Sequence, residues 1–292
     1  METLHQTFQT FLDVEGLTKK KVLLMVSGGV DSMVLLDVAH KIMPLEQLAV
    51  FHLDHQVRHD SKEDFIFVQN ICSKLGIKFY GKTLSLDSGS EAEWRSARQK
   101  FSQEAAQEFG ADRILTGHHA TDLVETMVFR LSKGAGPNGL SPFNIHTKPF
   151  WRIPKSDIKE YANTNELKWR IDPTNEDTKY RRNLIRKEIL PALREITPNL
   201  EKVFVQESQL FDEVDQFLQK STPSTKDPLP LKDFLALDPA IQKTWLRQVS
   251  GTIPSLSEIA DCLKWLRGNP EGKTQKKIGL TNLTILDNCI CF

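Results

Sequence analysis

The segment Ser27–Ser32 has the residue types of a phosphate-binding loop. It reads Ser-Gly-Gly-Val-Asp-Ser and lies between an apolar run, Val22–Val26, and a predicted helix, Asp31–Met43. Glycines at such a turn let the backbone approach a ligand closely, and the free amides at the start of the helix favour an anion. No Gly-Lys-Ser/Thr follows, so this is not a Walker A loop. The loop predicts a phosphate site, the alternative being a strand-to-helix turn that uses glycine for geometry alone.

Two more polar segments follow predicted strands. His52–Arg58 comes at the end of the strand Leu48–Leu53, and Gly117–Asp122 comes after the strand Arg113–Thr116. The carboxyl ends of parallel strands share one edge of a sheet, which is where open α/β folds place their ligands. We therefore expect both segments to lie near the glycine loop.

The side chains of these segments allow a metal hypothesis. Residues with metal-ligand chemistry are His52, Asp54, His55, His118 and His119. Hydrogen-bonded loop histidines, or a histidine that faces a nucleotide, would give the same pattern, and we favour these over a structural zinc site. Magnesium is a different case, because a nucleotide brings it and one or two carboxylates suffice. The candidate carboxylates are Asp31, Asp122 and Glu125.

A basic run near the middle of the chain is the third signal. It contains five basic residues without an intervening acid, namely Lys179, Arg181, Arg182, Arg186 and Lys187. Arg182 and Arg186 are four residues apart and share a helix face. A solvated helix face is the plain alternative, but arginine suits bidentate phosphate contacts. We predict that this segment binds phosphate or RNA.

The elements that must position these residues alternate along the first half of the chain. Strands are predicted at Val22–Val26, Leu48–Leu53, Ile77–Thr83 and Arg113–Thr116, separated by helices at Asp31–Met43, 61–75 and Glu91–Phe109 and followed by one at Thr121–Leu131. This alternation indicates an α/β fold with an open parallel sheet and helices on both faces. Further helices are predicted at Ile158–Leu167, Tyr180–Leu193, Leu200–Leu218, Asp238–Val249 and Ser255–Leu266.

A break in the pattern divides the chain. Ser221–Pro230 has three prolines and no apolar period, so we predict a domain over residues 1–219, a linker over 220–230 and a small, mainly helical domain over 231–292. The last of these carries local positive charge at Lys264, Arg267, Lys273, Lys276 and Lys277. Charge of this kind can hold RNA away from a reaction centre.

Composition excludes several classes of protein. Lys and Arg total 38 and Asp and Glu total 38, so no overall positive charge argues for nucleic-acid binding. The four cysteines form no Cys-x-x-Cys pair and are too sparse for a disulfide scaffold. No apolar run reaches the roughly 20 residues that a membrane helix needs. We expect a cytoplasmic enzyme that does not contact membranes.

The glycine loop resembles the pyrophosphate-binding loop of the N-type ATP pyrophosphatases. Further segments narrow the resemblance: His52–Arg58, Glu93–Arg98, His118–Thr126, Gly134–Leu140, Trp169–Asp177 and Tyr180–Arg186. Together, from about Lys21 to about Asn199, they resemble the tRNA(Ile) lysidine synthetase family, in the shorter form that has one C-terminal domain. Asp54 and Thr121 depart from the residues that are usual in that family.

The resemblance implies an ATP-dependent ligase that joins L-lysine to C2 of the wobble cytidine of tRNA(Ile) with a CAU anticodon. It implies ATP and Mg²⁺ as cofactors, and it allows a homodimer. The implied ATP-binding residues are Ser27, Gly28, Gly29, Val30, Asp31 and Ser32, and Asp31 is implied to contact Mg²⁺ or the cytosine. The implied catalytic residues are Asp31, Arg98, His118 and Asp122, and the implied tRNA or phosphate ligands are Arg95, Arg181, Arg182 and Arg186.

Two alternatives stay open at this point. A tRNA cytidine 2-thiolase shares most of the N-terminal half but needs a cysteine-bound iron–sulfur cluster, and the chain has no Cys-x-x-Cys pair. A non-catalytic sensor of adenine nucleotides could use the same fold, but it would have no use for the basic run at Arg181–Arg186.

Overall fold

The chain divides into two compact units in the computed structural model. Unit 1 comprises residues 1–128 and 142–205, and unit 2 comprises residues 129–141 and 206–292. The structure describes residues 3–54, 61–84, 91–142, 144–171, 181–252, 254–268 and 275–292.

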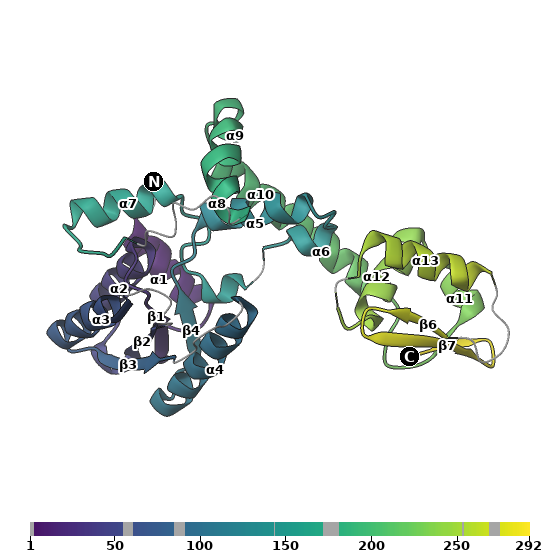
Figure 1. Cartoon of the computed structure of the whole chain (residues 1–292), viewed down its shortest axis with the longest axis horizontal. Coiled ribbons are helices and arrows are strands. Elements are labelled where there is room, and N and C mark those ends of the chain that lie inside the picture. Colours follow the sequence, from purple (N-terminus) through teal and green to yellow (C-terminus); the bar gives the residue numbers. More distant parts are fainter. Residues whose placement is uncertain are drawn as a thin grey trace. The chain divides into compact units, whose positions relative to one another are not determined.

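Unit 1 is built on a parallel sheet of four strands. The strands are β1 (Val22–Met25), β2 (Leu48–Asp54), β3 (Lys78–Thr83) and β4 (Arg113–Thr116), in the order β3-β2-β1-β4. Every neighbouring pair is parallel, and Leu24 lies opposite both Val50 and Leu115. The predicted open parallel sheet is confirmed, and the carboxyl ends of its strands share one edge (Figure 1).

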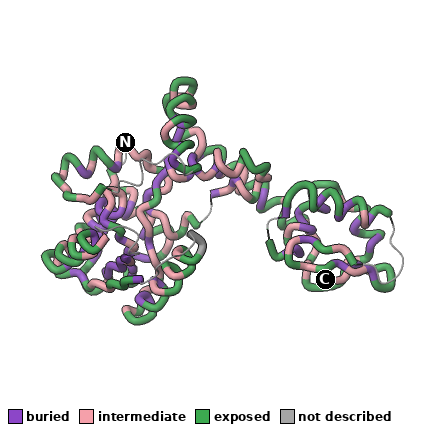
Figure 2. The backbone as a smooth tube through the Cα atoms, in the orientation of Figure 1, coloured by how far each residue is buried: buried purple, intermediate pink, exposed green. Residues whose placement is uncertain are grey.

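Helices cover both faces of this sheet, as the sequence pattern predicted. On one face, Val22 and Leu24 belong to a core shared with α1 (Leu4–Val14), α2 (Val30–Ile42), α3 (Ser61–Leu75) and α7 (Lys155–Thr164). On the other face, Leu23 and Phe51 pack against α4 (Glu91–Phe109). Strand side chains alternate between faces, so a strand buried on both sides has apolar residues at consecutive positions. Figure 2 shows the buried backbone running through the middle of the unit.

The remaining elements begin in unit 1. They are α5 (Ala120–Leu131), α8 (Arg181–Leu184), a π-helical turn (Ile185–Ile189), α9 (Leu190–Ile196) and α10 (Leu200–Ser221), with short 3₁₀ turns at Leu45–Gln47 and Ile145–Thr147. The continuous helix predicted at Tyr180–Leu193 is therefore interrupted. Pro191 has no N–H to donate to the carbonyl four residues earlier, and the Leu190 N–H reaches back five residues to the carbonyl of Ile185.

Unit 2 packs three helices against an antiparallel sheet. It contains α6 (Pro137–Leu140), α11 (Leu231–Ala236), α12 (Pro239–Val249) and α13 (Leu256–Arg267), with β5 (Leu229–Pro230), β6 (Gln275–Ile278), β7 (Thr281–Leu286) and β8 (Cys289–Cys291). The strand order is β5-β8-β7-β6. Trp245 and Phe234 are fully buried at the centre, with their ring centroids 5.3 Å apart. The sequence predicted the two longer helices but neither α11 nor the pairing of the strands.

The four cysteines are free thiols. Burial raises the pKa of Cys72 to about 12 and that of Cys262 to about 11. These two side chains therefore stay protonated and belong to the apolar cores of units 1 and 2, respectively. Across the described part of the chain, the helices are too short or too polar to cross a membrane.

Candidate active site

The glycine loop joins β1 to α2 and is fixed by its own serines. Gly28 has a φ of +90°, a conformation that a residue with a Cβ rarely adopts. The Ser32 hydroxyl accepts the Ser27 N–H at 3.2 Å and donates to the Gly29 carbonyl at 2.9 Å. The Arg170 N–H donates to the Gly28 carbonyl at 2.9 Å. The loop carbonyls are thus paired away from the start of α2, which can receive an anion.

The loop after β4 packs directly on the first turn of α2. A Cβ on Gly117 would lie 2.7 Å from the carbonyl oxygen of Asp31 and 2.9 Å from its carbonyl carbon. Real Cβ atoms do not come this close to a backbone, so only glycine fits here. The predicted convergence of Gly117–Asp122 with Ser27–Ser32 is therefore found in the structure.

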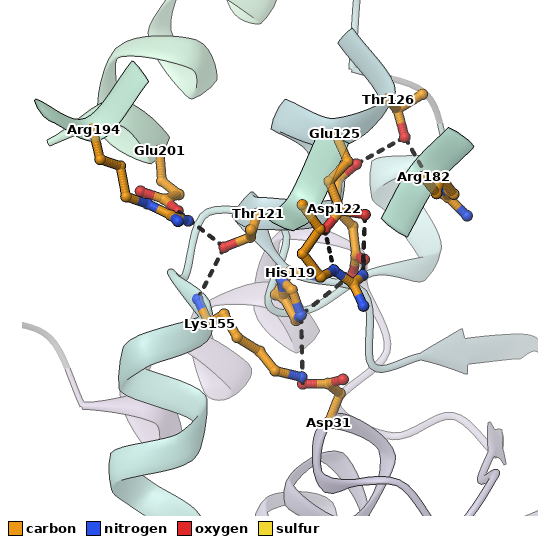
Figure 3. Close-up of polar contacts among 11 residues, drawn as sticks. Asp31, His119, Thr121, Asp122, Glu125, Thr126, Lys155, Arg182, Arg194 and Glu201 are labelled. Carbon is orange, nitrogen blue, oxygen red and sulfur yellow. Dashed lines mark hydrogen bonds and ion pairs between the residues drawn. The ribbon is translucent and has the colours of Figure 1, made fainter. Parts of the chain in front are cut away.

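This close approach places a histidine between two carboxylates. The Nε2 atom of His119 lies 3.4 Å from Oδ1 of Asp31 and 3.6 Å from Oδ2 of Asp122, and Figure 3 shows the ring between them. The His119 N–H also donates to Asp122 at 3.1 Å. Only 4% of His119 is exposed, and its buried Nδ1 finds no partner among the described residues. Lys155 completes the cluster, since its Nζ contacts Oδ1 of Asp31.

The pKa of Asp122 shows which charges dominate the cluster. Burial works to raise that pKa, but His119 and His118, followed by the His119 N–H and Arg186, hold it below its usual range. Asp122 therefore stays ionised near neutral pH and is a weak base. Removal from water lowers the pKa of His118, and Lys148 and Arg182 add to this effect against the opposing charge of Asp122. His118 is therefore mainly neutral near pH 7, with its Nδ1 2.8 Å from the hydroxyl of Thr116.

Two arginines of the basic segment, Arg182 and Arg186, contact α5 beside this cluster. Arg186 holds the fully buried Glu125 through two hydrogen bonds, Nε to Oε1 at 2.6 Å and Nη2 to Oε2 at 3.0 Å. The same Nη2 lies 3.8 Å from Asp122. Arg182 donates to the Thr126 hydroxyl at 3.2 Å (Figure 3). Arg186 is thus committed to an internal ion pair, whereas Arg182 is exposed and bonds to a neutral hydroxyl.

A second ion pair lies beside the start of α5. Glu201, at the start of α10, pairs with Arg194 and accepts the Thr121 hydroxyl at 3.1 Å. Thr121 in turn accepts the backbone N–H of Lys155 at 3.2 Å (Figure 3). These bonds connect α5, α7 and α10 around the cluster.

Other residues singled out in the sequence lie on α4, α8 and β2. Arg95 and Arg98 are exposed on α4, and the contacts described for the cluster do not include them. Arg181 is exposed at the start of α8. His52 is buried, and its Nδ1 donates to the Val26 carbonyl at 2.7 Å, so it fixes the end of β1. The segments 55–60 and 172–180, which include His55, lie outside the described residues.

Two contributors were not foreseen. Lys155 begins α7 and Glu201 lies near the start of α10, so both come from helices with no recognisable motif. Lys155 is separated from Asp31 by 124 residues. No local pattern in the sequence marks either residue, because their roles depend on how the helices pack.

The carboxylates suit a magnesium ion that arrives with a nucleotide. The described residues contain no group of three or more His, Cys, Asp or Glu side chains that could hold a metal by themselves. Magnesium keeps most of its ligands as water and phosphate oxygen and needs only one or two carboxylates. Asp31 fits this requirement, since its carboxylate already holds a cation, the ammonium of Lys155.

Comparisons with known proteins agree with this geometry. The family model described as a PP-loop domain matches residues 1–193. A tRNA(Ile)-lysidine synthase from Petrotoga mobilis is 31% identical over 268 residues, which cover 85% of this chain and 86% of the relative. The chain belongs to the tRNA(Ile)-lysidine synthase family. The PP-loop match indicates that this part of the chain binds ATP.

Two further comparisons give the extent of the similarity. A family member from Thermotoga maritima is 33% identical over 270 residues, and the chain spans only 64% of the length of that relative. The solved structure of the U34-tRNA thiolase NcsA from Methanococcus maripaludis, which contains a [4Fe-4S] cluster, superposes with a TM-score of 0.59 at 17% identity. The match covers 70% of this chain and 78% of the thiolase, and it shows a shared fold.

The close approach at Gly117 can be tested by adding one methyl group. Gly117→Ala must push the β4–α5 loop away from α2, so we expect a loss of about 2 kcal/mol in unfolding free energy and about tenfold weaker ATP binding. Chemical denaturation and calorimetric titration with ATP measure the two effects. Gly110→Ala is the control, because a Cβ there meets nothing within 4 Å although φ is +73°. It should cost about 1 kcal/mol and leave ATP affinity unchanged; equal ATP binding by both variants would contradict the argument.

The Arg186–Glu125 pair can be tested in the same way. Arg186→Met leaves the carboxylate of Glu125 buried without its partner, so we expect the unfolding free energy to fall by about 2 kcal/mol. The double variant Arg186→Met/Glu125→Gln should recover much of this loss, because the buried charge is removed. Arg181→Met, on the exposed surface of the same helix, should change stability by less than about 0.5 kcal/mol. Similar losses for Arg181→Met and Arg186→Met would rule out a specific buried pair.

Proposed function

We propose that this chain catalyses the reaction of its family, the ATP-dependent joining of L-lysine to C2 of the wobble cytidine of tRNA(Ile) with a CAU anticodon. The observation that carries the proposal is the cluster of Asp31, His119 and Asp122 at the start of α2. It adds two carboxylates and a buried histidine to an anion-binding loop. A loop that only bound a nucleotide would not need this second set of charges.

In the first step, the O2 atom of the cytidine attacks the α-phosphorus of ATP and pyrophosphate leaves. Negative charge builds on the leaving group, so oriented backbone amides at Gly28–Ser32 stabilise it. Asp31 is the residue that would hold Mg²⁺, which supplies positive charge against the phosphate oxygens when bound. The Ser27 and Ser32 hydroxyls keep the loop in its anion-binding shape.

In the second step, the ε-ammonium of lysine loses a proton, the resulting amine attacks C2 of the adenylated cytidine, and AMP leaves. His118 is suited to accept that proton, because its lowered pKa leaves the imidazole neutral near pH 7. Asp122 stays ionised and is suited to attract the cationic lysine. The resemblance also assigns Arg98 to this step; that assignment remains a proposal that rests on the family pattern.

We infer that tRNA is held by exposed basic residues in both units. In unit 1 these are Arg181 and Arg182, with Arg186 limited by its bond to Glu125 and Arg95 on α4 as a further candidate. In unit 2, Lys264 and Arg267 lie in the last turn of α13, which contacts the strand β6 that carries Lys276 and Lys277. Residues 231–292 would thus add a second basic surface, after the linker proposed at 220–230, on a unit that contains none of the proposed catalytic residues. A cytoplasmic location and a homodimer belong to the same proposal.

The decisive experiment measures lysine incorporation. Purified protein with Mg²⁺, ATP, labelled lysine and a tRNA(Ile) transcript bearing CAU should label the tRNA and release AMP and pyrophosphate in equal amounts. Asp31→Asn should remove at least about 99% of the turnover, because it loses the charge beside the phosphates. Labelling by arginine or ornithine as strong as by lysine, or no labelling at all, would refute the proposal. Label from a sulfur donor in place of lysine would support a thiolase instead.

The role of the basic run has its own signature in the salt dependence of tRNA binding. Replacing Arg181 and Arg182 with alanine should weaken binding and reduce the slope of log K against log salt by about 0.7–0.9 for each phosphate that is no longer neutralised. Lys19→Ala/Lys74→Ala is the charge-matched control, because both lysines are exposed at the opposite edge of the sheet. Lys19 lies just before β1, and Lys74 lies in the last turn of α3. An equal slope in both double variants would mean that Arg181 and Arg182 form a solvated helix face.

A further inference from the structure

Lys155 is placed beside the glycine loop by bonds on both sides of its own backbone. Its N–H donates to the Thr121 hydroxyl at 3.2 Å, and two residues earlier the Ile153 carbonyl accepts the Ala120 N–H at 2.8 Å. Thr121 is itself held by the buried end of Glu201. The start of α7 is therefore fixed against the start of α5.

A separate polar network fixes α7 against α2. The Tyr161 hydroxyl donates to Asp37 at 2.7 Å, and the Lys41 ammonium donates to Asn165 at 3.0 Å. These hydrogen bonds fix the position of α7 relative to α2. Figure 3 shows the Lys155 ammonium beside the carboxylate of Asp31.

The side chain of Lys155 keeps freedom that its backbone lacks. Its side chain is 29% exposed, and that of Asp31 is 33% exposed, so water reaches both. Four methylenes allow an ammonium to swing through several ångströms. By contrast, Arg186 is engaged by both oxygens of Glu125, and His119 is buried. Lys155 is thus the cation in contact with Asp31 whose side chain is both partly exposed and held by a single carboxylate oxygen.

The negative charge of Asp31 lies close to the predicted phosphate site, and a nearby cation would offset it. Its carboxylate lies in the first turn of α2, beside the amides that favour phosphate. An uncompensated carboxylate there would repel a triphosphate, so it needs a positive partner both with and without ligand. Before a nucleotide arrives, the ammonium of Lys155 fills that need. A divalent cation bound with ATP would compete for the same oxygen.

We propose that Lys155 is a positioning residue for the nucleotide, which neutralises Asp31 in the free protein and transfers to a phosphate oxygen of ATP when a divalent cation replaces it on Asp31. The inference rests on the proposed binding of ATP at Gly28–Ser32 and adds a residue outside the motifs. Lys155 exchanges one anionic partner for another, so no charge is left uncompensated at either stage.

The exchange predicts two effects of opposite sign for Lys155→Met. Without nucleotide, Asp31 has no competing ammonium, so the affinity for a divalent cation alone should rise about threefold to fivefold, as expected for a partly exposed ion pair. With nucleotide, the variant cannot offer an ammonium to the phosphate, so the dissociation constant for ATP in Mg²⁺ should rise about tenfold. A residue that merely supported the fold would change both affinities downward or neither.

The whole chain serves for both measurements. Mn²⁺ alone is titrated and the free ion is followed by electron paramagnetic resonance, while ATP with Mg²⁺ is titrated by calorimetry. Lys159→Met is the matched control, because Lys159 is exposed one turn further along the same helix; it should alter neither affinity. Lys155→Arg keeps the cation and should stay within about threefold of wild type in both titrations.

The outcomes separate the possibilities. Tighter Mn²⁺ binding together with weaker ATP binding in Lys155→Met supports the exchange. Weakening of both, or no change in either, overturns it, and Lys155→Gln repeats the test if the methionine variant does not fold. Failure of the wild-type protein to bind ATP at all would instead defeat the proposed function, so the two failures can be told apart.

Discussion

The absence of a side chain at Gly117 is the constraint on which the site depends. The backbone of the β4–α5 loop touches the backbone of Asp31 so closely that no Cβ fits between them. This close approach joins two segments that are remote in sequence, the glycine loop after β1 and the His118–Asp122 segment after β4. The neighbouring arrangement of β1 and β4 makes it possible, because the carboxyl ends of both strands reach the same edge.

The charged side chains of the site are of two kinds. Some are held by several hydrogen bonds, and one pair is partly exposed and flexible. The buried Glu125 accepts two hydrogen bonds from Arg186, which hold the π-helical turn Ile185–Ile189 on α5. Asp122 is tied to His119 by a backbone bond and stays ionised. At Asp31, in contrast, the compensating charge is carried by a flexible and partly exposed side chain. The rigid pairs shape the site, and the flexible pair leaves one carboxylate available to incoming ligands.

The sequence was sufficient for the parts of the molecule whose signals are local. Buried parallel strands appear as continuous apolar runs, and the glycine loop indicates a turn that faces an anion, so the sheet and the edge that carries the site could be predicted. Lys155 and Glu201 could not, because their place depends on the packing of α7 and α10 against α5 and α2. Arg186 shows a related limit. Its spacing from Arg182 indicated a shared helix face. Its buried partner, Glu125, could not be predicted, because the contact forms only when α5 packs against the π-helical turn Ile185–Ile189.

The π-helical turn at Ile185–Ile189 changes the direction in which the side chains of α9 point. In a regular α-helix each residue advances the side chain by about 100°, so two residues eight apart differ by about 80° in direction. The extra residue of the wide turn removes one such step, which leaves Arg194 about 20° from the direction of Arg186. Each arginine has an acidic partner, Glu125 for Arg186 and Glu201 for Arg194. The wide turn therefore sets the direction in which Arg194 points. In a relative that lacked one residue here, the arginine would point about 100° away and could pair only with a different acid.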